Sequence, residues 1–85
     1  MNAIIIDTGY RRGRYAYETK ECGYGWFELL EYDELEKGDE LEGDFEKLGE
    51  IDILKLSDNN KYHICNEDYG MSLSVVLRKI KPSSR

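Results

Sequence analysis

The residues best suited to ligand chemistry near the N-terminus are arginines and tyrosines in one short stretch. Arg11, Arg12 and Arg14 are followed at once by Tyr15 and Tyr17. Guanidinium groups bind phosphates and carboxylates, and tyrosine rings stack on bases or pack against apolar side chains. The stretch therefore predicts either a binding surface or a hairpin turn that happens to be basic.

A second group that could do chemistry contains the only histidine. His63 and Cys65 are two residues apart, so a strand would place both side chains on one face. A structural zinc site needs four ligands, and Cys22 would have to arrive from a distant turn. A Cys–His nucleophile pair has no recognisable sequence context here. We expect partly exposed polar residues on a late strand, reduced thiols, and no metal or cofactor.

Two further ligand-binding motifs are incomplete in this sequence. A calcium loop starting at Asp33 would need oxygen ligands where Leu35 and Lys37 stand. The Gly-Tyr-Gly at 23–25 begins like a dinucleotide fingerprint, but Glu28 replaces the third glycine. An 85-residue chain is also short for a cleft that perturbs paired carboxylates, so we do not expect an enzyme.

Charge is divided unevenly along the chain, whose formal net charge is −6. Residues 1–20 hold four cations and two carboxylates, whereas residues 21–70 hold four lysines and sixteen carboxylates. Residues 71–85 hold four cations and no carboxylate. An acidic body disfavours non-specific binding to nucleic acids and membranes. A basic face can still form if the two ends of the chain meet in space.

Length and composition predict one small domain over residues 1–81, with a tail at 82–85. Seven tyrosines, two phenylalanines and a tryptophan argue against a disordered chain. The opening MNAIIID is too short an apolar run for a signal peptide, and no run approaches the roughly 18 residues of a membrane span. We expect a cytoplasmic protein without membrane contact, either a monomer or a weak dimer.

Short apolar or alternating runs separated by turn residues predict a mainly β chain. Residues 40–47 alternate with period two, which favours a strand over the helix that their acidity suggests. The alternation of apolar residues changes phase at Ile53-Leu54, which predicts a bulge or burial on both faces of the strand. The same position could mark an open edge for dimerisation. The predicted strands are 3–6, 15–19, 26–32, 40–47, 51–56 and 61–66.

The last segment changes character after residue 70. Ser72 can cap a helix, and the apolar residues that follow it have helical spacing. Leu73, Val75 and Leu77 also alternate, so a strand remains an alternative. We favour a helix over residues 72–81. The expected fold is therefore a small barrel of five to six short antiparallel strands with a C-terminal helix.

The order of these parts resembles OB-fold and cold-shock-like domains over roughly residues 3–47. The step Leu35-x-Lys37-Gly38-Asp39-x-Leu41 is similar to the one that introduces their fourth strand. Cold-shock domains stack bases on aromatics of the second and third strands beside a basic glycine-containing motif. The stretch 12–17 occupies that place here, with Arg14 where the motif has its first aromatic.

Two functions follow as expectations. The favoured one is a small non-enzymatic binding or regulatory module for a protein partner, with the acidic residues 40–50 available to a basic partner and Tyr24, Tyr32 and Tyr69 as anchors. The alternative is weak binding of single-stranded RNA or DNA on the hairpin face. The candidate face in either case is Arg11, Arg12, Arg14, Tyr15, Tyr17 and Trp26.

Overall fold

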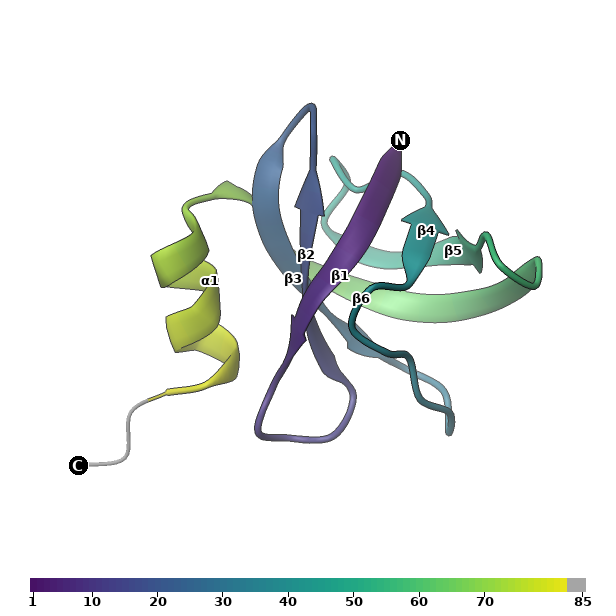
Figure 1. Ribbon diagram of the computed structural model, residues 1–85, viewed down its shortest axis with the longest axis horizontal. Coiled ribbons are helices and arrows are strands. Elements are labelled where there is room, and N and C mark those ends of the chain that lie inside the picture. The colour runs from purple at the N-terminus through teal and green to yellow at the C-terminus, as the bar shows by residue number, and fades with distance from the viewer. Residues whose placement is uncertain (83–85) are drawn as a thin grey trace.

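The computed structural model describes residues 1–82 and shows a six-stranded β-barrel with one helix beside it (Figure 1). Most of the predicted tail, residues 83–85, lies outside the described residues. The elements are β1 (Asn2–Thr8), β2 (Arg14–Thr19), β3 (Gly23–Leu29), β4 (Glu40–Glu42), β5 (Gly49–Lys55), β6 (Asn60–Met71) and α1 (Leu73–Ile80).

Two three-stranded meanders close the barrel in the order β1-β2-β3-β6-β5-β4. Every pairing is antiparallel, and the seams are β3 with β6 and β1 with β4. Closure leaves no long unpaired edge, which protects a small sheet from adding strands of another chain. The predicted fold class, a mainly β barrel with a C-terminal helix, is confirmed, and this barrel is compatible with an OB-like layout.

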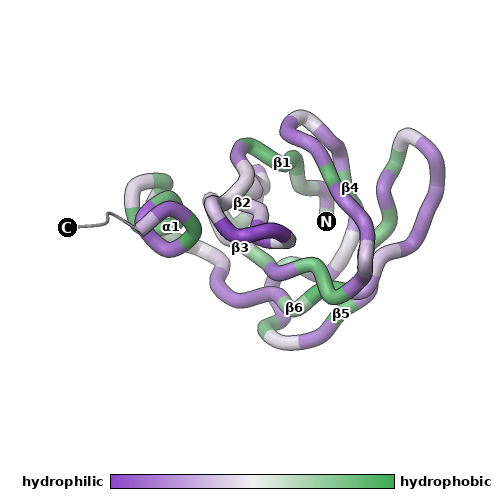
Figure 2. The backbone as a smooth tube through the Cα atoms, turned by 90° about the horizontal axis from the view of Figure 1, so that it is seen from below, coloured by the Kyte–Doolittle hydropathy of each residue, from purple (hydrophilic) through white to green (hydrophobic). Residues whose placement is uncertain are grey.

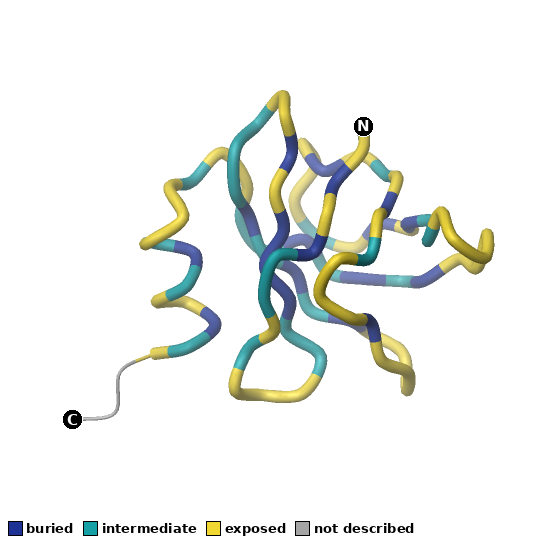
Figure 3. Tube along the Cα trace, in the orientation of Figure 1, coloured by how far each residue is buried: buried dark blue, intermediate teal, exposed yellow. Residues whose placement is uncertain are grey.

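Alternating side chains of all six strands fill the barrel. Tyr17 and Phe27 are fully buried there, and Phe45 closes the core from the loop after β4. Figure 3 shows buried positions alternating with more exposed ones along the strands. Their rings pack with centroids 6.0 Å apart for Tyr17 and Phe27 and 4.6 Å apart for Tyr17 and Phe45. Large aromatic side chains let a short chain build a dense interior from few residues.

Helix α1 packs on the outside of the barrel, along β2 and β3 (Figure 2). Ser72 caps it by accepting a hydrogen bond from the Val75 amide, as its sequence position predicts. Val76 and Ile80 are buried against Ala16 in a second, smaller apolar cluster. The predicted helix is confirmed over the strand alternative, because helical spacing places these two side chains on one face.

The predicted strand 40–47 is wrong beyond Glu42. Gly43 lies so close to β5 that an added Cβ would be 2.7 Å from Ile53 Cγ2, and the chain turns there. Leu41 and Phe45 are both buried, so the period-two pattern identified the inward residues correctly. The β4 pairing ends because the following residues leave the sheet and fold across the mouth of the barrel.

Other details of β3, β5 and β6 differ from the prediction. The β5–β6 ladder runs from Gly49↔Asn66 to Lys55↔Asn60 without a register shift, so the bulge at Ile53-Leu54 is wrong and burial on both faces explains the pattern. The predicted open edge there is also wrong, because β5 pairs with both β4 and β6. Strand β6 continues to Met71 instead of ending at residue 66, and β3 occupies 23–29 rather than 26–32. The apolar phase shift reflects Leu54, which is half-buried on the outer face.

Candidate binding surface at the basic end of the barrel

The turn between β1 and β2 holds the arginine-rich stretch. Gly9 donates its amide to the Arg14 carbonyl at 2.7 Å, which closes the turn. Gly13 has φ +87, a left-handed conformation that glycine adopts without strain. The arginines therefore project from a short connection held at both ends by the barrel wall.

Two of the predicted site residues lie inside the barrel. Tyr15 is 4 % exposed and Tyr17 is 0 % exposed. The Tyr15 hydroxyl accepts a hydrogen bond of 2.9 Å from the Leu35 amide, and the Tyr17 hydroxyl donates one of 2.8 Å to Asn66 Oδ1. Buried rings with satisfied hydroxyls are not available to stack on a base, so their shared face is the inner one.

Trp26 and Arg14 lie on the opposite side of the wall, next to α1. The register pairs Ala16 with Trp26, so both residues face outward. Trp26 donates Nε1–H to Asp68 Oδ2 at 2.8 Å, and Arg14 Cζ lies 5.5 Å from its ring centroid. Two of the six predicted residues thus lie inside the barrel, two lie outside it beside α1, and Arg11 and Arg12 project from the turn, so the six do not form one surface.

The two basic segments of the chain meet beside this turn. Tyr10 donates its amide to the Ile80 carbonyl at 3.1 Å, at the end of α1. Lys81 Nζ lies 2.9 Å from Asp7 Oδ1 and 5.9 Å from the Tyr10 ring centroid. The hydrogen bond from Lys81 holds the pKa of the Asp7 carboxyl below its usual value. The C-terminal end of α1 thus supports the hairpin turn directly.

The aromatic side chains exposed near the β1–β2 turn are not part of the predicted candidate face. Tyr10 is 75 % exposed, and Tyr32, in the loop after β3, is 93 % exposed. Arg12 Cζ lies 4.9 Å from the Tyr32 ring centroid, in a cation–π contact. A shallow hollow of about 280 Å³ separates the turn from residues 34–35. We call the residues Tyr10, Arg11, Arg12 and Tyr32 the basic end.

Only one of these two tyrosines had a sequence signal. Tyr32 falls at the end of the predicted strand 26–32 and is exposed because β3 ends at Leu29. Tyr10 follows an apolar run and stands among turn residues. Residues at such positions have no sheet neighbour to bury them. The three predicted anchors include Tyr32 but not Tyr10. Of the other two, Tyr24 packs in the cluster under α1, and Tyr69 is 38 % exposed on β6.

His63 is held between two carboxylates that sequence reasoning missed. Its Nε2 lies 2.8 Å from Glu50 Oε1 and its Nδ1 lies 2.8 Å from Asp52 Oδ1, both on β5. Its backbone amide donates to Glu31. Hydrogen bonds to Glu50 and then Asp52 raise the pKa of the His63 imidazole. The period of two along paired strands explains why these three side chains share the outer face.

Cys65 and Cys22 are both free thiols. Burial raises the pKa of the Cys65 thiol, as does its hydrogen bond with Glu67. The Cys22 thiol donates to Glu46 Oε2 at 3.1 Å, and this contact raises its pKa. A thiol held protonated is a weak nucleophile and a weak metal ligand. Within residues 1–82, no group of three or more metal-ligating side chains is placed to hold an ion.

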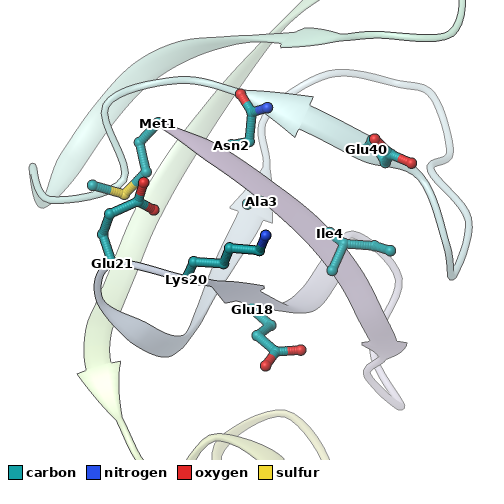
Figure 4. Close-up of a pocket in the computed structure, with 8 residues that line it drawn as sticks. All are labelled: Met1, Asn2, Ala3, Ile4, Glu18, Lys20, Glu21 and Glu40. Carbon is teal, nitrogen blue, oxygen red and sulfur yellow. The ribbon is translucent and has the colours of Figure 1, made fainter.

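A larger open hollow of about 620 Å³ lies across the outer face of β1 (Figure 4). Ile4 forms part of its floor and pairs with Glu18 on β2 and with Glu40 on β4. Lys20 extends over the same hollow in Figure 4. The acidic residues expected to face a partner do not form one surface. Glu40 lines this hollow and Glu50 bonds to His63, whereas Glu42 pairs with the N-terminal amine and Glu46 accepts a hydrogen bond from the Cys22 thiol.

No helix in residues 1–82 is long and apolar enough to cross a membrane. No protein-family model, curated protein or solved structure matches the chain.

Proposed function

We propose that this chain is a small non-enzymatic binding module whose partner is a protein, bound at the basic end. The observation that carries the proposal is the pair of tyrosines there, 75 % and 93 % exposed, with arginines between them. Tyrosine and arginine are the residue types enriched at the energetic centres of protein interfaces. Fully exposed rings gain apolar contact only when a partner covers them.

Hydrogen bonds to the helix and the barrel hold the two loops of the basic end, which favours recognition by preformed loops. The Tyr10 amide is bonded to Ile80, and the loop that carries Tyr32 is anchored where the Leu35 amide meets Tyr15 inside the barrel. Leu35 itself is buried. Loops fixed by a rigid scaffold lose less entropy on binding than free segments do.

Single-stranded nucleic acid is the second candidate partner. The convergent cations and the Arg12–Tyr32 contact favour it, since bases stack on aromatic rings beside arginines. The loop of Tyr32 also carries Glu31, Asp33 and Glu34, which would repel a phosphate chain. We therefore expect no tight binding to oligo-dT or oligo-U at about 150 mM salt.

A comparative capture experiment tests the proposal. Tagged wild-type protein and a Tyr10→Ala/Tyr32→Ala double variant are used to capture proteins from cells of the natural source. We expect a defined set of proteins to be retained by the wild type and lost with the double variant. Leu48→Ala serves as the control, because Leu48 is 56 % exposed in the loop between β4 and β5.

Two results would count against a protein partner at the basic end. One is a captured set that the double variant retains unchanged. The other is a steep, salt-dependent affinity for oligo-dT that Arg12→Ala and Tyr32→Ala abolish. All four substituted side chains, those of Tyr10, Arg12, Tyr32 and Leu48, are exposed, so matching circular dichroism spectra should show that each variant folds.

A further inference from the structure

We infer that the partner segment bound at the basic end is acidic, and that Glu34 occupies the place of its carboxylate in the free protein. The inference rests on the proposed function and names the chemistry of the partner. Glu34 then competes with the partner's carboxylate for Arg12, and this competition lowers the affinity of the site without changing its shape.

The geometry of Arg12 carries this inference. Its Nη2 lies 3.8 Å from Glu34 Oε2, and the two side chains are 62 % and 72 % exposed. The same guanidinium lies over the Tyr32 ring. An exposed pair at this distance contributes little to stability, so another carboxylate can replace Glu34 at small cost. A carboxylate that accepts two guanidinium hydrogen bonds would bind more strongly than Glu34 does.

Further cations lie in the turn and at the end of α1. Among residues 1–82, Arg11 forms no ion pair, while Lys81 is already engaged by Asp7. Arg78 and Lys79 are exposed in the last turn of α1, whose end bonds to the turn at Tyr10. A ligand with more than one negative charge can therefore meet Arg12 and Arg11 together.

The neighbouring carboxylates favour a peptide over a nucleic acid as the acidic ligand. Glu31 and Asp33 flank Tyr32, and Glu34 follows them in the same loop. A nucleic acid brings a charge with every nucleotide, so part of its backbone would face these groups. A peptide can place carboxylates at the arginines and uncharged residues over the acidic loop. Charge complementarity thus selects an acidic protein segment.

Fluorescence anisotropy with a defined probe tests the inference. The probe is a short fluorescein-labelled peptide of alternating Glu and Gly, and the matched peptide has Lys in place of Glu. We expect the wild type to bind the acidic probe in preference to the basic one. Arg12→Ala should weaken this binding about fivefold or more, and Glu34→Gln should strengthen it about two- to fivefold.

Glu36→Gln is the matched control, since it removes the same charge from the same loop. Glu36 forms no ion pair with Arg12, and its amide bonds to Asp39. The gain from Glu34→Gln should therefore exceed the gain from Glu36→Gln. Equal effects of the two variants would overturn the role of Glu34, because they would reflect net charge alone.

The remaining outcomes separate this inference from the proposed function. No preference of the wild type for the acidic probe would overturn the inference, and so would tighter binding of oligo-dT than of the acidic peptide. If the capture experiment still identifies proteins that depend on Tyr10 and Tyr32, the proposed function stands with a different partner chemistry. If capture also fails, both are overturned.

Discussion

The Tyr17 hydroxyl on β2 donates a hydrogen bond of 2.8 Å to Asn66 Oδ1 on β6, inside the barrel. Asn66 in turn donates through Nδ2 to the carbonyls of Phe45 and Lys47, at 3.0 and 2.9 Å. Burial raises the pKa of the Tyr17 hydroxyl, which therefore remains a donor. This connection joins the two strands that flank β3 to the loop that closes the barrel.

Tyr17→Phe should destabilise the protein by about 1–3 kcal/mol, because it leaves Asn66 Oδ1 buried without its donor. Urea denaturation followed by tryptophan fluorescence measures the change. Tyr10→Phe removes an exposed hydroxyl and should change the free energy of unfolding by less than about 0.5 kcal/mol. Equal stability of the two variants would show that the interior hydrogen bond contributes nothing.

Gly25→Ala should destabilise the protein by about 2 kcal/mol or more, since overpacking strains a dense interior. An added Cβ would collide with the Asp68 carbonyl and lie 2.5 Å from the Tyr17 hydroxyl oxygen. Gly38→Ala tests backbone conformation alone, because Gly38 has φ +95 and open space around it. That variant should cost about 1 kcal/mol, and thermal unfolding should rank the two in this order.

Asp7→Asn should remove the ion pair that links β1 to Lys81, at a cost below about 1 kcal/mol for a partly exposed pair. The pKa of Asp7 is lowered in the folded state, so its contribution is present above the ordinary value of 3.8. It is lost as the pH falls through the folded pKa. The stabilities of variant and wild type should therefore differ at neutral pH and converge in strong acid. A difference that is independent of pH would contradict the role of this ion pair.

His63→Asn should have the opposite pH dependence. The folded pKa of His63 lies above 6.5, because Glu50 and Asp52 both accept hydrogen bonds from the imidazolium, with Glu31 also near. The stabilisation is full below 6.5 and disappears as the pH rises through the folded pKa. Melting temperatures at several pH values should show the variant less stable in mild acid and equal to the wild type in alkali. His63→Asn in a Glu50→Gln/Asp52→Asn background should lose this pH dependence.

Local patterns predicted much of the fold. Alternation placed Leu41 and Phe45 on one face, which is the inward one, and Ser72 with helical spacing located α1. Boundaries failed where a strand continues or stops through contacts with distant residues. Strand β6 is longer than predicted because β3 pairs with it as far as Met71, and β4 is shorter because Gly43 meets Ile53.

By itself, the sequence determined the β class, the capped helix, the glycine turn and the uneven charge, because each depends on residues close together in the chain. Only the tertiary structure decided which aromatics are exposed. Tyr15 and Tyr17 were equally compatible with either face of a strand until closure of the barrel turned them inward. The same closure brought Tyr10 beside Ile80 and Arg12 beside Tyr32. Contacts between segments far apart in the chain depend on register and packing, which no local pattern encodes.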